Sequence, residues 1–163
     1  MRWSCVLLSL LAFNLSANTL VLTEQPISLA KTIESSWQEC DELMWCDDKL
    51  AYYRSSYFAQ ATVASGHVEI ELMSEFSVHR FSQLQLNLRA DGFSLQVVEV
   101  EGERFDVAKQ LSTSTSSDVD AALVRFINRY SQQVPRTLTW QSTLWNAELI
   151  SDGDVIALRF VSR

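Results

Sequence analysis

The spacing of apolar residues predicts two helices in the first third of the chain. After Pro26, which suits a first helical turn, apolar residues recur four apart over residues 27–38. A second helix is predicted from Asp47 or Asp48, either of which can cap it, to about residue 61, because apolar residues again recur three and four apart. The residues with these spacings are Leu29, Ile33 and Trp37 in the first helix and Leu50, Tyr53 and Tyr57 in the second.

From His67 the period shortens to two, which is typical of a strand with one face exposed to water. Apolar and acidic residues alternate over residues 68–72, and this pattern predicts the first strand of a meander. A longer second strand is predicted over residues 76–88, where most apolar residues fall at even positions. The even-numbered apolar residues of that segment are Phe76, Val78, Leu84, Leu86 and Leu88.

The next segment contains two turn signals. The Asp91-Gly92 pair predicts a hairpin, after which a strand runs over residues 93–100. The apolar positions of this strand change parity near Val97, and such a change indicates a β-bulge. A turn at residues 101–103 then leads into a returning strand at 105–107.

The last third predicts a loop, a helix and a closing hairpin. The low-complexity stretch 111–117 is expected to be an exposed loop, and Ser117 to cap a helix that ends before Pro135. The final hairpin turns at residues 151–154. Its last strand, 155–161, is apolar on both faces, which favours a central position in the sheet.

These elements predict an α+β domain in which an antiparallel sheet of about six strands carries helices packed on one face. No internal repeat is visible in the sequence.

Residues 1–17 are interpreted as a signal peptide. A positive start at Arg2 precedes an apolar run, 6–13, that is too short to span a bilayer, and cleavage is expected after Ala17. The remaining 146 residues, 18–163, form one domain by length. We therefore expect a soluble bacterial-type protein in the periplasm or outside the cell, with no membrane insertion after cleavage.

The processed chain carries 12 Lys and Arg against 20 Asp and Glu, a net charge of about −8. This charge argues against nucleic acid as a partner. Two cysteines remain after processing, Cys40 and Cys46, in a compartment where disulfides persist. Six residues apart on a helix, their Cα atoms would be separated by roughly 10 Å, beyond the roughly 7 Å limit of a disulfide, so their pairing requires a chain break between them.

Catalytic and metal-binding patterns are sparse. Neither His67 nor His79 occurs in a zinc-ligand spacing, and no nucleophile elbow is present. Two sets of carboxylates would form an acidic patch if their strands were neighbours, Glu69 with Glu71 and the series Glu99, Glu101 and Glu103. Asp152 and Asp154 in the last turn offer too few oxygens for Ca²⁺. We therefore predict no catalytic, cofactor-binding or metal-binding residue.

Two tryptophans near the C-terminus give the sharpest residue prediction. Trp140 and Trp145 differ by five positions, so on one regular strand they point to opposite faces. Trp140 shares parity with Leu138 and Leu144 and is expected to be buried. Trp145 is then an exposed residue and a candidate contact for a protein partner. The alternative is that both tryptophans are buried in the core.

Three functions remain open from the sequence. The first is a non-catalytic interaction or assembly module with a protein partner in the cell envelope, acting through a sheet face or edge. The second is a small hydrolase whose site is assembled only in three dimensions, and the third is a carrier of a small ligand in a cavity between helices and sheet. The sequence favours the first, because catalytic residue types are few and aromatic residues are frequent.

Overall fold

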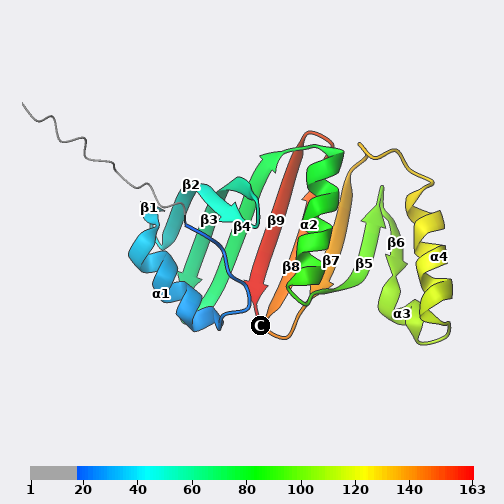
Figure 1. The fold of residues 1–163 in the computed structure, drawn as a ribbon, viewed down its shortest axis with the longest axis horizontal. Helices are drawn as coiled ribbons and strands as arrows, with labels where there is room; N and C mark the ends of the chain where they lie inside the picture. Colours follow the sequence, from blue (N-terminus) through cyan, green and yellow to red (C-terminus); the bar gives the residue numbers. More distant parts are fainter. Residues whose placement is uncertain (1–17) are drawn as a thin grey trace, which may run out of the picture.

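The computed structural model describes residues 18–163, so the predicted signal peptide, 1–17, lies outside the described residues. One antiparallel sheet of nine strands dominates the fold, in the order β1-β2-β3-β4-β9-β8-β7-β5-β6 (Figure 1). The first half of the chain contains α1 (Pro26–Ser36), β1 (Gln38–Asp41), β2 (Met44–Tyr52), β3 (Ser55–Ala64) and β4 (His67–Glu75). The second half contains α2 (Val78–Ala90), β5 (Ser94–Val100), β6 (Glu103–Asp106), α3 (Val107–Leu111), α4 (Ser116–Ile127), β7 (Arg136–Gln141), β8 (Trp145–Ser151) and β9 (Val155–Ser162).

The core lies on one face of the sheet. Side chains alternate between buried and more exposed along β3, β4, β7, β8 and β9. The buried set packs against α1 and α2, which lie on the same side of the sheet (Figure 1). The predicted fold class, α+β with an antiparallel sheet, is therefore confirmed. The predicted number of strands, about six, is wrong.

The last strand of the chain occupies the middle of the sheet, as its two apolar faces predicted. β9 pairs antiparallel with β4 on one side and with β8 on the other. The β4–β9 seam divides the sheet into two halves with a related element order. In the first, α1 precedes β1, β2, β3 and β4, and in the second, α2 precedes β5, β7, β8 and β9, with β6, α3 and α4 inserted after β5.

The helix predicted to end near residue 61 is wrong, because this segment forms the β2–β3 hairpin. Tyr52 pairs with Ser55 across a two-residue turn in which Tyr53 has a positive φ of 55°. The buried residues alternate along the strands, at Leu50 and Tyr52 and then from Tyr57 onward. Spacings of three and four residues arose here from two strands joined by a turn without glycine.

The strand predicted over 76–88 is also wrong, since this segment contains α2. Phe81, Leu84 and Leu88 are buried at helical spacing, whereas Leu86 is 57% exposed. Ser77 caps the helix by accepting a hydrogen bond from the Arg80 backbone N–H. The Asp91-Gly92 pair consequently ends a helix instead of closing a hairpin.

Other local predictions agree with the structure. α1 matches the first predicted helix, and β5 pairs with β7 through a register shift between Leu95 and Val97, where the bulge was expected. The predicted turn at residues 101–103 joins β5 to β6. The predicted loop at 111–117 is shorter than expected, because α4 begins at Ser116 and Thr115 caps it instead of Ser117.

Cys40 and Cys46 form the predicted disulfide. Their sulfur atoms are 2.06 Å apart and their Cα atoms 5.8 Å apart. Cys40 lies in β1 and Cys46 in β2, so the required chain break is the turn between these two strands. The disulfide fastens an edge strand of only four residues to its neighbour.

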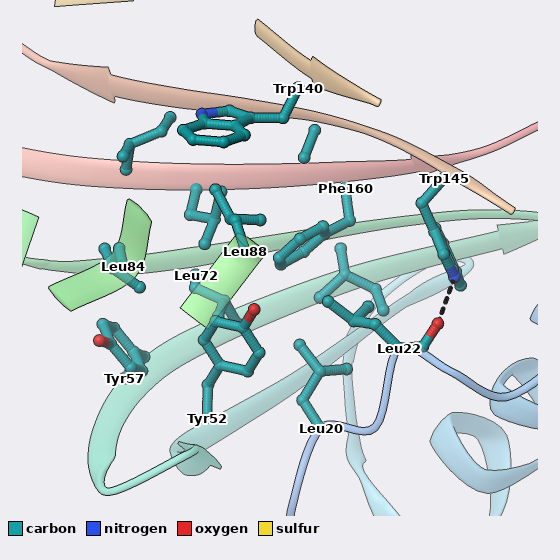
Figure 2. Packing of buried hydrophobic residues seen from close by; sticks show 14 of the residues in the cluster. Leu20, Leu22, Tyr52, Tyr57, Leu72, Leu84, Leu88, Trp140, Trp145 and Phe160 are labelled. Carbon is teal, nitrogen blue, oxygen red and sulfur yellow. Dashed lines mark hydrogen bonds between the residues drawn. The ribbon is translucent and has the colours of Figure 1, made fainter. Parts of the chain in front are cut away.

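The expected exposure of Trp145 is wrong. Trp140 is the penultimate residue of β7 and Trp145 begins β8, so a hairpin turn separates them and both side chains face the core. They are 1% and 0% exposed. The Trp145 indole donates a hydrogen bond of 3.1 Å to the Leu22 carbonyl, as Figure 2 shows. A completely buried side chain is not available as a contact for a protein partner.

The segment ahead of α1 is also part of the fold. Leu20 and Leu22 belong to the core, and the Leu20 N–H donates to the Ala51 carbonyl of β2 at 2.9 Å. From there the chain crosses the covered face toward Trp145 (Figure 2). No helix within residues 18–163 is long and apolar enough to cross a membrane.

Candidate ligand-binding site

A pocket of about 290 Å³ lies on the helix-covered face of the second half-sheet. It is bounded by α2, by the strands β5 and β7, and by the end of α4 with the connection that follows it. Thirteen residues line it: Phe76, Val78, Phe81, Ser82, Gln85, Val98, Val100, Ile127, Asn128, Tyr130, Gln132, Arg136 and Leu138.

One wall is the first part of α2. Val78, Phe81, Ser82 and Gln85 follow the spacing of a single helix face, so the helix presents all four to the same space. Phe76, just ahead of the helix, is fixed because its backbone N–H donates a hydrogen bond to the Asp154 carbonyl at 2.8 Å. This wall is apolar near the sheet and more polar toward solvent, where Ser82 is exposed.

The floor is provided by two paired strands. Val98 of β5 lies opposite Leu138 of β7, and Val100 lies opposite Arg136. The three apolar side chains are buried and give the pocket a hydrophobic base. Arg136 is therefore a cationic residue at the end of an otherwise apolar row.

The remaining wall belongs to the segment inserted into the second half-sheet. Ile127 ends α4, and Asn128, Tyr130 and Gln132 belong to the connection between α4 and β7. Phe126 of α4 packs against Phe105 of β6, with ring centroids 5.5 Å apart, and this contact anchors the insertion to the end of the sheet (Figure 1). The pocket therefore depends on the part of the second half that the first half does not have.

Arg136 is the main polar feature of the pocket. Its side chain is 8% exposed, and its Nε donates to the Val134 carbonyl at 3.3 Å while Nη2 donates to the Ser131 carbonyl. These two bonds hold the guanidinium beside the connection that forms the wall. The guanidinium carbon lies 5.9 Å from the centre of the Phe81 ring, which lines the same pocket. Burial lowers the pKa of Arg136 from its usual value.

Tyr130 adds a second polar group. Its hydroxyl oxygen is buried and has no hydrogen-bond partner within residues 18–163. Burial, and after it the nearby Glu103 carboxylate, raise the pKa of Tyr130, so the neutral hydroxyl is favoured. A neutral phenol is a hydrogen-bond donor that can still be satisfied by a ligand.

The two histidines of the described chain, His67 and His79, lie outside this pocket. His67 begins β4 and its Nδ1 is 3.2 Å from the Ser162 hydroxyl oxygen, which also accepts a hydrogen bond from the Val68 N–H. No ion pair or hydrogen bond joins His67 to a carboxylate in the described part of the chain. His79 is exposed on α2. The structure thus brings a serine to one histidine without the third member of a catalytic triad.

The carboxylates considered as an acidic patch are not brought together. Glu69 and Glu71 of β4 both pair with Arg159 of β9, each at 3.2 Å. The series Glu99, Glu101 and Glu103 lies around the β5–β6 turn, with three strands between β4 and β5 in the sheet order.

Asp152 has a structural role in the β8–β9 turn. Its Oδ1 accepts hydrogen bonds from the N–H groups of Asp154 and Val155, at 2.9 and 2.8 Å. These bonds lower the pKa of the Asp152 carboxyl. Among residues 18–163 no group of three or more His, Cys, Asp and Glu is arranged to hold a metal ion.

None of the pocket residues was predicted from the sequence as a site residue. A signal existed for Arg136, because it shares parity with Leu138 and Trp140 and is therefore a charge on the apolar face of a strand. The helical wall was hidden by the interpretation of residues 76–88 as a strand.

Comparison with protein-family models, with curated proteins and with solved structures found no match to this chain.

Proposed function

We propose that this protein is a non-catalytic binding module that holds a small, largely apolar molecule in the pocket between α2 and the β5–β7 floor. The observation that carries the proposal is the pocket itself, which has a hydrophobic floor and six polar or charged residues among the thirteen that line it. Its volume of about 290 Å³ is close to the lower end of the range for ligand pockets, roughly 300–1,000 Å³, and suits a compact ligand.

A carrier of this kind develops the third function left open by the sequence. The hydrolase alternative has less support, because the His67–Ser162 pair has no acidic partner among the described residues and lies outside the pocket. We propose that the protein acts outside the cytoplasm, in the periplasm or after secretion, as the predicted signal peptide and the disulfide suggest.

Binding of a protein partner is the second candidate function, and one feature of the outer sheet face favours it. Four apolar side chains lie in one row across four adjacent strands, since Phe58 pairs with Met73, Met73 with Ala157 and Ala157 with Ile150. Phe58 is 37% exposed. The sheet edges suit a partner less well, because β1 and β6 are four residues long and carry several charges.

The carrier proposal is tested by adding a library of small aromatic and aliphatic compounds to the isotope-labelled protein and recording backbone amide NMR spectra. We expect binding compounds to shift the amide signals of pocket residues. Ser82→Trp places a large side chain on the exposed wall of the pocket and should abolish these shifts.

Leu86→Trp is the matched control, because it adds the same side chain to an exposed position of the same helix outside the pocket. If compounds bind both variants equally, or if no compound shifts the pocket amides, the carrier proposal is wrong. Neither substitution alters the outer face, so binding of a protein partner there would be unchanged.

A further inference from the structure

The pocket contains a single ionisable charge, and it is positive. The thirteen lining residues include Arg136 but no aspartate, glutamate, lysine or histidine. This is unexpected in a chain with a net charge of −7. We propose that the ligand of this pocket is an organic carboxylate, with its apolar body on the β5–β7 floor and its carboxylate paired with Arg136. The proposal rests on the carrier function proposed above.

Arg136 has no carboxylate partner among the described residues. Arg136 is the only charged residue among the buried residues of the described chain. The arginines that form ion pairs are Arg104, Arg129 and Arg159, which are more exposed and have a carboxylate within 4 Å. Burying a cation without an anion is costly, so an anionic ligand would supply the interaction that the protein does not.

Two backbone carbonyls orient the hydrogen-bond donors of the Arg136 guanidinium. The Val134 and Ser131 carbonyls accept hydrogen bonds from Nε and Nη2 of Arg136 and fix the plane of the guanidinium. The hydrogen bonds of the Arg136 side chain within residues 18–163 come from Nε and Nη2 and none from Nη1, and the Tyr130 hydroxyl has no hydrogen-bond partner there. One cationic N–H donor and one phenolic donor in the same pocket match the acceptor capacity of a carboxylate.

The rest of the pocket lining combines apolar, aromatic and polar residues. Val98, Val100 and Leu138 offer an apolar base, and Phe76 and Phe81 offer aromatic surface. This part of the lining favours a hydrocarbon or aromatic body, while Ser82, Gln85, Asn128 and Gln132 make the rest of the lining polar. A phosphate dianion is a poorer match, because it would meet only one positive charge and few donors. The small volume favours a short-chain or single-ring acid over a long-chain lipid.

The test compares two molecules that share a body and differ in their head group, 4-phenylbutyrate and 4-phenyl-1-butanol. Isothermal titration at neutral pH should show that the acid binds about tenfold more tightly than the alcohol, the effect expected of one charge-assisted hydrogen-bonded pair. In Arg136→Gln this preference should disappear, while the alcohol keeps its affinity.

Because Arg136 also holds the connection between α4 and β7, two further variants separate charge from structure. Arg136→Lys retains the charge and should retain part of the preference for the acid. Tyr130→Phe leaves Arg136 in place. It should lower the affinity for the acid several-fold without changing the affinity for the alcohol. Arg159→Gln removes an equal charge from the outer face and is expected to change neither affinity.

The outcomes distinguish the two proposals. Equal binding of acid and alcohol by the unmodified protein would overturn the carboxylate proposal and leave the carrier function standing. A preference for the acid that survives in Arg136→Gln would also overturn it. If neither compound binds, and no compound of the NMR library shifts the amide signals of pocket residues, the carrier function is overturned as well.

Discussion

Asp91 joins the two halves of the molecule through two tyrosines. Its Oδ2 accepts a hydrogen bond from the Tyr52 hydroxyl at 2.7 Å, and its Oδ1 accepts one from the Tyr53 hydroxyl at 2.6 Å. The tyrosines come from the β2–β3 hairpin, whereas Asp91 caps the C-terminal end of α2. A single carboxylate therefore links a turn of the first half to a helix end of the second.

Burial and the hydrogen bond to Asp91 raise the pKa of Tyr53 to about 12, from its ordinary value of 10.0. Because the folded pKa is the higher one, the stabilising effect is complete below pH 10 and is lost as the pH rises from 10 to 12. We expect the free energy of unfolding to decrease over this interval. The decrease should be smaller in Tyr53→Phe, measured by urea unfolding at a series of pH values.

Subtracting the two curves removes the contributions of lysines and other tyrosines, which titrate in both proteins. A tyrosinate absorbance titration provides the independent check, since Tyr53→Phe should remove a group titrating near pH 12. Identical stability profiles for the two proteins would contradict the role given to Tyr53.

At the scale of elements, the β7–β8 hairpin supports the core through its two tryptophans, Trp140 and Trp145. We expect Trp140→Ala and Trp145→Ala each to cost about 3–5 kcal/mol of unfolding free energy, as for other large truncations in a core. Trp145 also satisfies the Leu22 carbonyl, so its loss should additionally loosen the segment ahead of α1. Urea unfolding measures the first effect, and amide hydrogen exchange of residues 19–24 the second.

Leu86→Ala is the control for this pair, because Leu86 is exposed and its truncation should change stability by about 0.5 kcal/mol or less. A Trp145→Ala variant as stable as the unmodified protein would contradict the assignment of this residue to the core.

The elements that the sequence predicted correctly have patterns that only one structure explains. β9 is apolar on both faces apart from Arg159 and its last residue, Ser162, and α1 combines an N-terminal proline with a single apolar stripe. By contrast, Leu84 and Leu88 fit a strand and a helix equally well, and only their burial against the sheet decides between the two. The β2–β3 turn at Tyr53 has no glycine, so no local signal revealed the hairpin.

The pocket was less predictable than the fold, for a physical reason. Its walls come from segments up to about sixty residues apart, and their meeting depends on strand order. The disulfide was predictable, because it required only two cysteines, a spacing and an expected compartment. Arg136 was partly predictable. Its position in the alternating pattern of Leu138 and Trp140 shows a charge on an apolar strand face, but does not indicate what that charge contacts.

At the scale of the whole molecule, processing and oxidation are expected to occur together. Mass spectrometry of the exported protein should show an N-terminal Asn18 and a mass two hydrogens below that of the reduced chain, for the Cys40–Cys46 disulfide. Treatment with a reductant should restore the two hydrogens. An intact Met1, or two free thiols after export, would contradict the expected location outside the cytoplasm.

The central position of β9 has a consequence for the order in which the molecule can be assembled. Residues 155–162 are synthesised after the other eight described strands, yet β4 and β8 can be joined only through them. We expect any shorter nascent chain to consist of two half-sheets with unpaired inner edges, which cannot complete a common core. We therefore expect the common core to form only after residues 155–162 have been synthesised.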